Sequence, residues 1–365
     1  MPDTPRTVDA IDTPAALVDV DRMHANLRRV AAYCREHGLA WRPHAKTHKT
    51  PELAVEQVRA GAVGVTVATP REAEVMSRVV DDLLLAYPPI GRAKLDRLMA
   101  LPAGVRLTVG LDSAEALRGL AEAARAAGRP VGVLVETDAG MGRVGVQSAE
   151  DAVALARAAA EADGVEYRGI LFYPGHVRER VEQQGDAIRT LSDRLGQTLE
   201  ALHAAGVAPS VVSGGSTPTF WRSHEIAGLT EVRPGTSIFN DRTTSEIGAC
   251  AWGECAYSVL ATVVSTAVPG QAVVDAGSKA LSREEIRADS TGFGALLDRP
   301  EVLVKAVSEE HGLLDLSRTD WRPRIGERVR IVPNHVCVSV NLHERLHGVR
   351  GDDVAHVWTI AARGR

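Results

Sequence analysis

Short apolar runs alternate with longer amphipathic stretches over the first two thirds of the chain. Residues 64–69 (GVTVAT), 105–112 (VRLTVGLD) and 131–138 (VGVLVETD) are rich in β-branched residues, a pattern typical of buried strands. Residues 113–128 (SAEALRGLAEAARAAG) repeat apolar positions at helical spacing and end at glycine. When LAWRPHAK (39–46) is counted as the first strand, eight such strand-then-loop units run to about residue 245.

Strands that are buried on both faces and separated by helices predict a parallel sheet. Eight units over roughly 200 to 250 residues have the size of an α/β protein of the (β/α)8 or TIM-barrel type, with a doubly wound open sheet as the alternative. Beyond residue 245, segments such as GERVRIVP (326–333) indicate strands joined by turns. We therefore predict a barrel over residues 23–245 and a C-terminal β-rich domain over 246–365. Residues 1–22 are assigned to the β-rich domain, because the strand-like ALVDV (16–20) could pair with it.

Composition and charge exclude several classes of protein. The chain has 365 residues and a formal net charge of −5, and no long basic run suggests a nucleic-acid partner. Its apolar stretches are shorter than the roughly 18 residues that span a bilayer, and its first residues show no signal-peptide core. The four cysteines form no CxxC pair. We expect a cytoplasmic protein that binds neither nucleic acid nor membrane.

The segment RPHAKTHK (42–49) surrounds Lys46 with His44, His48 and Lys49 where the first barrel strand ends. Functional residues of parallel barrels lie at the C-terminal ends of the strands. Neighbouring positive charge disfavours the ammonium form of a lysine and makes the amine a better nucleophile towards a carbonyl. Lys46 is therefore a candidate Schiff-base lysine, and the alternative is a solvated surface lysine.

A glycine loop, SGGST (213–217), follows a late strand and supplies consecutive backbone N–H groups beside hydroxyls. Such a loop can cradle a phosphate, although a plain tight turn is the alternative. No Walker lysine is present, which argues against a nucleoside triphosphate. A phosphate cradle combined with a candidate Schiff-base lysine favours pyridoxal 5′-phosphate (PLP). The candidate cofactor ligands in this loop are Ser213, Gly214, Gly215, Ser216 and Thr217.

Further polar residues fall at other strand ends. Thr69 ends GVTVAT, Arg143 lies in the GMGRVG loop, and Tyr173 and His176 lie in YPGH. Arg143 could face the pyridine nitrogen of PLP, and Tyr173 could pack on the cofactor. His176 is as well explained as a structural histidine bonded to the backbone.

The segment PNHVC (333–337) places His335 and Cys337 two residues apart in the β-rich domain. On a strand their side chains would point the same way. Imidazole and thiolate suit Zn²⁺, and two protein ligands leave positions for water and substrate. A buried cysteine beside a hydrogen-bonded histidine is the alternative.

Eight motifs in this order resemble the D-threonine aldolase and D-serine dehydratase family of fold-type III PLP enzymes, which have an alanine-racemase-like barrel. They are RPHAKTHK, DAGMGRVGV, YPGH, SGGSTPT, EVRPGT with FND, DAGSKALS, SEEHG and PNHVC, and they cover nearly the whole chain. The chain departs from the family at Ser237, where many members have tyrosine after RPGT.

The resemblance implies roles for particular residues. Lys46 would hold the cofactor covalently, Arg143 would face its ring, and Tyr173, the SGGST loop and Thr236 would hold it and its phosphate. His335 and Cys337 would bind a divalent metal near the substrate's β-hydroxyl. Family members are typically homodimers in which the β-domain of one subunit completes the active site of the other.

The reaction implied is a lyase reaction on a D-3-hydroxy amino acid. It is either retro-aldol cleavage to glycine and an aldehyde, or elimination to a 2-oxo acid and ammonia. The His-x-Cys pair resembles the zinc dehydratase arrangement, whereas Mn²⁺ or Mg²⁺ accompanies the His-x-Asp pair of aldolases. His44, His48 or a water on the metal could act as the base. An amino-acid racemase that uses Tyr257 and a non-catalytic PLP-binding protein are the alternatives.

Overall fold

The computed structural model describes residues 5–286 and 290–364, which form two compact units. One unit comprises residues 29–235 and the end of the chain from 362, and the other comprises the first 28 residues and 236–361. The sequence alone predicts that the barrel domain ends at residue 245. The helix α1 (Val20–Glu36) runs across the first division.

The first unit contains eight parallel strands in one sheet, as predicted. Their order is β2-β9-β8-β7-β6-β5-β4-β3. The strands are β2 (Ala40–Trp41), β3 (Val65–Val67), β4 (Asp82–Leu85), β5 (Arg106–Leu111), β6 (Val131–Glu136), β7 (Val165–Leu171), β8 (Val211–Gly214) and β9 (Glu231–Val232). β6 is buried along its whole length, which explains its uninterrupted apolar sequence.

The two ends of this sheet are joined, so that the sheet closes into a barrel. His44 forms a parallel bridge with Thr66, and the Thr66 N–H donates to the Pro43 carbonyl at 2.8 Å. This pairing lies beyond the regular part of β2, which stops at Trp41 rather than running to residue 46. The (β/α)8 prediction is therefore confirmed, and the open-sheet alternative is wrong.

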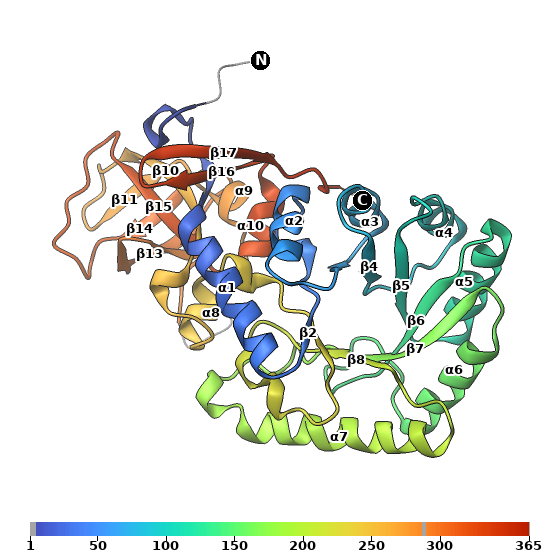
Figure 1. Cartoon of the computed structure of the whole chain (residues 1–365). Helices are drawn as coiled ribbons and strands as arrows, with labels where there is room; N and C mark the ends of the chain where they lie inside the picture. Colours follow the sequence, from blue (N-terminus) through green and yellow to red (C-terminus); the bar gives the residue numbers. More distant parts are fainter. Residues whose placement is uncertain (1–4, 287–289, 365) are drawn as a thin grey trace. The chain divides into compact units, whose positions relative to one another are not determined.

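Helices lie on the outside of the barrel sheet (Figure 1). They are α2 (Pro51–Arg59), α3 (Pro70–Met76), α4 (Arg92–Met99), α5 (Ala114–Ala127), α6 (Ala149–Glu161) and α7 (Gly185–Ala204). Thr69, Ser113 and Ser148 each cap a helix by accepting a hydrogen bond from an N–H in its first turn. These caps satisfy helical donors that otherwise have no partner, and so fix where the loops after the strands begin.

The second unit is built on a nine-stranded sheet in the order β11-β14-β13-β12-β15-β10-β1-β16-β17, with a further pairing of β10 to β11 that closes part of it into a barrel. Its strands are β1 (Ala15–Asp19), β10 (Tyr257–Ser265), β11 (Gln271–Val274), β12 (Gly294–Leu296), β13 (Arg299–Val307), β14 (Gly312–Asp315), β15 (Arg328–Pro333), β16 (Arg345–Arg350) and β17 (Asp353–Thr359). As expected, the N-terminal strand β1 belongs here: it pairs with β10 and β16. Short helices α8 (Arg242–Glu246), α9 (Ser278–Leu281) and α10 (Val336–Leu342) accompany the sheet.

The prediction that PNHVC lies on a strand is wrong. β15 ends at Pro333, and His335 is the N-cap of α10, so that Cys337 lies in the first turn of a helix. The reason is tertiary, because the backbone groups that would continue the sheet are bonded elsewhere. The Asn334 carbonyl accepts from the N–H and hydroxyl of Thr243, and the Val336 N–H donates to Asp241.

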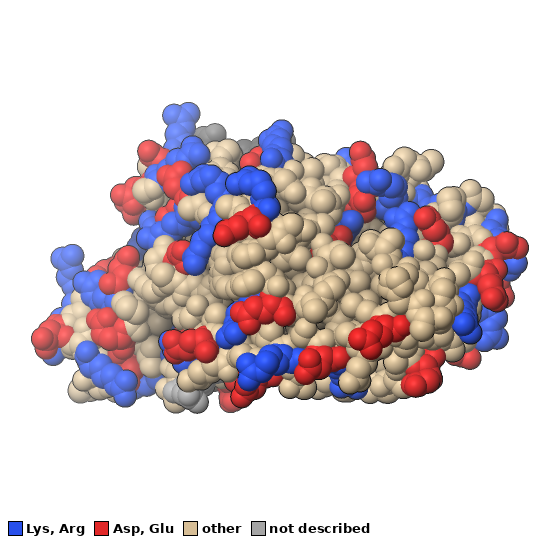
Figure 2. Space-filling view, turned by 60° about the horizontal axis from the view of Figure 1, so that its bottom comes forward, with Lys and Arg blue, Asp and Glu red and all other residues tan. Residues whose placement is uncertain are grey.

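Among the described residues, no helix is both long enough and apolar enough to span a bilayer. On the face shown in Figure 2, acidic and basic side chains are interspersed among wide uncharged areas.

A buried ionic network ties the strands of the barrel together. The carboxylate of Glu231 accepts from Arg42 Nε at 2.7 Å and from the hydroxyl of Ser213 at 2.6 Å. Ser213 in turn accepts from Arg233 Nη1 at 2.6 Å, and Arg233 Nη2 donates to the Phe172 carbonyl at 2.8 Å. Glu231 and Arg233 are 4% and 6% exposed, so these charges depend on one another rather than on water.

We predict that Glu231→Ala lowers the free energy of unfolding by about 3–5 kcal/mol, because it removes one of the two carboxylates paired with Arg42 and the main carboxylate that offsets the buried charge of Arg233. The matched control is Arg106→Ala, which removes an ion pair to Asp82 from a side chain that is 67% exposed. That change should cost no more than about 1 kcal/mol. Urea denaturation of the three proteins measures both values, and equal losses in the two variants would contradict the assignment.

Candidate active site

Lys46 lies at the mouth of the barrel, in a 3-10 turn (Ala45–Thr47) that follows β2. His44 precedes the turn as its N-cap, and its Nδ1 lies 3.5 Å from the Lys46 backbone N–H. The ammonium nitrogen of Lys46 is 5.8 Å from the centroid of the Tyr173 ring. Tyr173 follows β7, so two separate strand ends bring the amine and the phenol together.

His48 is a buried neutral side chain. Its exposed fraction is 0%, its Nδ1 accepts from the Thr50 N–H at 3.1 Å, and its Nε2 lies 3.1 Å from the Gln57 side-chain oxygen. Because Nδ1 accepts, the ring proton is on Nε2 and donates to Gln57. Burial lowers the pKa of His48 to about 4, so the imidazole is uncharged at neutral pH.

Lys49 and His44 also contribute less positive charge than the sequence suggests. Lys49 Nζ lies 3.6 Å from the carboxylate of Glu72, which is 1% exposed. Burial raises the pKa of Glu72, while its bond from the Ala68 N–H and the Lys49 and Lys46 charges oppose this.

Burial also lowers the pKa of His44 well below its usual range, and the charges of Lys46 and Arg233 lower it further. His44 and His48 are thus neutral and Lys49 is paired with a carboxylate. Among the basic groups of residues 44–49, Lys46 is the charged one for which no ion pair with a carboxylate is formed.

Arg143 reaches the same tyrosine as Lys46. Its guanidinium carbon lies 4.9 Å from the centroid of the Tyr173 ring. The loop that carries Arg143 is organised by Asp138, whose Oδ1 accepts from the backbone N–H groups of Gly140, Met141 and Gly142 at 2.9–3.1 Å. The structure therefore brings Lys46, Tyr173 and Arg143 together, although they come from three different strand ends.

The residues of the SGGST loop divide into two groups. Ser213 is committed to Glu231 and Arg233, and Gly214 lies against the Phe172 ring, which leaves no room for a side chain. Gly215 has a φ of +84°, a conformation that favours glycine. The Ser216 hydroxyl lies 3.1 Å from that of Thr219, and Thr217 is 6% exposed. The Ser216 N–H donates to the Thr219 hydroxyl at 3.2 Å, so the candidate backbone donors for an anion in this loop are Gly215 and Thr217.

The remaining candidates lie apart from this cluster or have local partners. The Thr69 hydroxyl accepts from the Glu72 N–H at 3.2 Å as the cap of α3. The His176 ring packs beside Gly140, under the loop that carries Arg143. Thr236 belongs to the second unit, where its hydroxyl lies 3.8 Å from Cys337 Sγ, and Ser237 is 8% exposed in the same turn.

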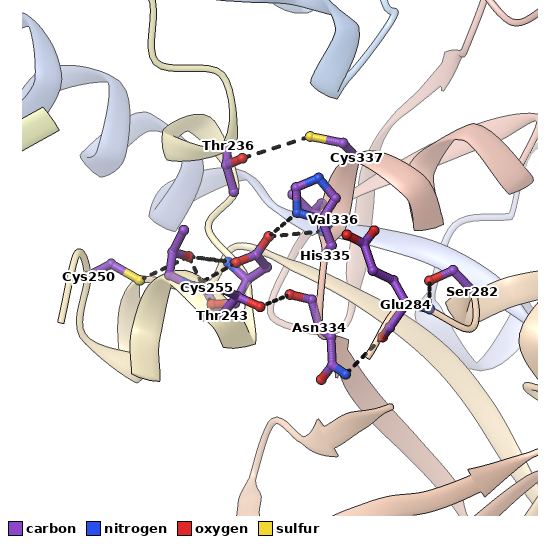
Figure 3. Close-up of polar contacts among 12 residues, drawn as sticks. Thr236, Thr243, Cys250, Cys255, Ser282, Glu284, Asn334, His335, Val336 and Cys337 are labelled. Atoms are coloured by element: carbon purple, nitrogen blue, oxygen red, sulfur yellow. Dashed lines mark hydrogen bonds and ion pairs between the residues drawn. The ribbon is translucent and has the colours of Figure 1, made fainter. Parts of the chain in front are cut away.

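His335 and Cys337 adjoin one another at the start of α10 (Figure 3). Burial lowers the pKa of His335, but the Cys337 thiolate and the Asp241 carboxylate outweigh burial and hold the pKa well above its usual range. No cluster of three or more His, Cys, Asp and Glu side chains suited to a metal occurs in residues 5–286 and 290–364. A nitrogen and a sulfur ligand with open positions remaining is the donor set of a catalytic rather than a structural zinc site.

Sequence reasoning missed several residues that shape these clusters: Gln57, Glu72, Asp138, Glu231, Arg233 and Asp241. Glu231 and Arg233 could have been found from the sequence, because charged residues within a buried barrel strand need charged or hydrogen-bonding partners. The partners of the others lie far along the chain or are backbone groups, and no spacing rule reveals them.

A cavity of about 520 Å³ lies beside α6 and α7 and is lined in part by Asp138, Phe172 and Arg194. Lys46, Tyr173 and Arg143 do not line it. The cavity is therefore distinct from the cluster of Lys46, Tyr173 and Arg143.

Comparison with known proteins agrees with this fold. Residues 18–243 match the family model "Alanine racemase, N-terminal domain", and residues 256–349 match "Putative serine dehydratase domain". The chain is 33% identical to a D-threonine aldolase of Arthrobacter sp, covering 97% of this chain and 93% of that enzyme. It is 34% identical to a D-threo-3-hydroxyaspartate dehydratase of Delftia sp., covering 94% and 99%. A metal-free variant of a D-threo-3-hydroxyaspartate dehydratase superimposes with a TM-score of 0.89 at 33% identity, covering 97% and 99%.

The barrel and its lysine-bearing mouth define a protein of the fold-type III, alanine-racemase-like class. The chain belongs to the family within that class that includes the D-threonine aldolases, the D-3-hydroxyaspartate aldolases and dehydratases, and the D-serine dehydratases.

The buried His48 predicts an acid-sensitive barrel. Its pKa is lower in the folded than in the unfolded protein, so the unfolded state binds a proton first as pH falls. The stabilisation is complete above about pH 6.5 and is lost progressively towards pH 4, by an amount on the order of 3 kcal/mol. We expect the free energy of unfolding to fall less steeply between these pH values in His48→Gln than in the wild type.

Chemical denaturation at several pH values measures this difference in slope. His203→Gln, which changes an exposed histidine in the last turn of α7, is the matched control and should keep the wild-type slope. A wild-type slope in His48→Gln would show that the buried imidazole does not govern the acid transition.

Proposed function

We propose that the protein is a PLP- and divalent-metal-dependent lyase of D-3-hydroxy amino acids. The observation that carries this proposal is the meeting of Lys46, Tyr173 and Arg143 at the barrel mouth, with the other basic groups around Lys46 neutral or paired. A half-buried amine beside an aromatic ring and a guanidinium suits an aldehyde cofactor.

The residues present fit PLP. Lys46 would hold the aldehyde carbon, and Tyr173 and Arg143 would contact the ring. The backbone N–H groups of Gly215, which makes the left-handed turn, and of Thr217 would receive the phosphate. When bound, the cofactor supplies an electron sink for charge that develops at the substrate Cα. Arg143 cannot lose its proton, so it would keep a facing pyridine nitrogen unprotonated and moderate that sink.

The donors of the second unit fit a divalent metal. We propose His335 and Cys337 as ligands of Zn²⁺ in preference to Mn²⁺ or Mg²⁺, because a thiolate is a soft ligand. The metal would supply Lewis acidity towards the substrate's β-hydroxyl. A related dehydratase solved in a metal-free form gives this proposal support from outside the chain.

The geometry narrows the choice of base among the chain's own histidines. Both ring nitrogens of His48 are engaged, by Thr50 and Gln57, so we propose a structural role for it. His44 adjoins Lys46 and is held neutral, and a neutral imidazole can accept a proton. We therefore propose His44 as the residue that exchanges a proton at or near the Lys46 amine.

A racemase is the second candidate function, and one contact of Tyr257 argues against it. The Tyr257 hydroxyl is buried and lies 2.9 Å from the Ser339 hydroxyl, and burial raises the pKa of this phenol. Such a phenol is poorly placed to exchange protons with a substrate. The relatives named as aldolases and dehydratases support the lyase reading. A homodimer, the assembly that the family resemblance implies, is part of the proposal.

The experiment is a product analysis of the purified protein with PLP and Zn²⁺, supplied with D-threonine and 3-hydroxy-D-aspartate. We expect turnover of these D-isomers and not of L-threonine, and loss of turnover by at least about 10³-fold in Lys46→Ala because covalent catalysis is removed. From D-threonine, glycine with acetaldehyde identifies the aldolase reaction, and 2-oxobutyrate with ammonia identifies the dehydratase reaction.

Chelation should abolish turnover of either kind, and Zn²⁺ should restore it. Interconversion of D- and L-alanine without cleavage would support the racemase instead. Full activity in Lys46→Ala would refute the assignment of the lysine.

A further inference from the structure

Asp241 is a buried carboxylate that has no role in the proposed reaction. Its exposed fraction is 0%, and it is the N-cap of α8. One oxygen, Oδ1, accepts from the Thr244 N–H at 2.9 Å and from the Thr244 hydroxyl at 2.8 Å. These two bonds on one oxygen fix the plane of the carboxylate from the α8 side.

The second oxygen of Asp241 faces the segment that carries His335. Oδ2 accepts from the Val336 N–H at 3.1 Å and lies 3.4 Å from Nδ1 of His335. The carboxylate thus contacts both the backbone and the ring of the segment that carries His335. Thr236, in the same stretch of chain, places its hydroxyl 3.8 Å from Cys337 Sγ. Residues 236–241 therefore contact both proposed ligands from one side.

We propose that Asp241 is a positioning residue that holds His335 in the orientation and tautomer required for metal binding. This inference rests on the proposed metal site. A carboxylate can only accept, so the His335 ring must carry its proton on Nδ1, and the lone pair that can bind a cation is then on Nε2. Carboxylate–histidine pairs of this kind orient the ring of a metal ligand and raise its basicity.

The pair also explains why a carboxylate is buried here at all. A buried charge is costly unless several hydrogen bonds compensate it, and Asp241 receives three from Thr244 and Val336 before the imidazole is counted. The cap of α8 alone would use Oδ1. The contacts of Oδ2 are with the α10 segment, where the ring of the proposed metal ligand His335 has to be oriented.

The test is the affinity of the PLP-loaded, full-length protein for Zn²⁺, measured by competition with a chromophoric chelator. Asp241→Asn keeps the size of the side chain and an acceptor for the cap, but removes the charge that fixes the tautomer. We expect its Kd for Zn²⁺ to rise about 10- to 100-fold, the usual effect of removing the partner of a metal-bound histidine. Thr244→Val is the matched control: it removes the hydroxyl bond on Oδ1, leaves Oδ2 in place, and should keep the wild-type Kd.

The outcomes separate the two proposals. Failure of the wild type to bind Zn²⁺ would overturn the metal site, and with it this inference, before any variant is made. Binding by the wild type with equal weakening in Asp241→Asn and Thr244→Val would show that Asp241 only caps α8. A wild-type Kd in Asp241→Asn would overturn the positioning role while the metal site stands.

A second measurement covers the case in which Asp241→Asn does not fold. A crystal structure of the zinc-loaded wild type should show His335 binding through Nε2, with Nδ1 on Asp241. Coordination through Nδ1, with Asp241 turned away, would overturn the inference.

Discussion

The closure of the barrel between Pro43–His44 and Thr66 is the constraint on which the rest of the barrel site depends. The first strand has only two regular residues, and the sheet is completed by backbone pairing beyond them. Residues 43 and 44 are fixed by that pairing, and the 3-10 turn that follows them places Lys46 at the C-terminal rim. The same edge carries Tyr173 and Arg143, so the position of the amine follows from how the sheet closes.

Charge compensation around the lysine explains the unusual sequence RPHAKTHK. The segment looks like a concentration of positive charge, but burial keeps the imidazoles of His48 and His44 uncharged, and Lys49 is paired with Glu72. Deeper in the barrel, Arg42 and Arg233 are held by Glu231 and Ser213. The flanking histidines therefore add no full positive charge beside Lys46. His48 supports the loop, and His44 is the one that adjoins the lysine.

The sequence predicted much of the fold because the barrel strands are buried on both faces and the helices begin at hydroxyl caps. These are local signals, and they located eight strands, the helices between them and the pairing of the N-terminal strand with the β-rich unit. Local signals failed at PNHVC, where the two-residue spacing of His335 and Cys337 was interpreted as strand geometry. There, Thr243 and Asp241 bond the backbone groups that a sheet would need, and α8 lies some ninety residues away in sequence. The partners Glu72, Gln57 and Asp241 were missed for the same reason.

The proposed function requires Lys46 to hold the cofactor covalently. Trapping the cofactor on the protein tests this requirement most directly. The holoprotein is reduced with borohydride, digested, and mapped by mass spectrometry, with Lys49→Ala as a matched control beside Lys46→Ala. We expect a phosphopyridoxyl group on Lys46 in the wild type and in Lys49→Ala, and none in Lys46→Ala. A phosphopyridoxyl group on Lys49 or another lysine of the wild type, or a covalent adduct that persists in Lys46→Ala, would contradict it.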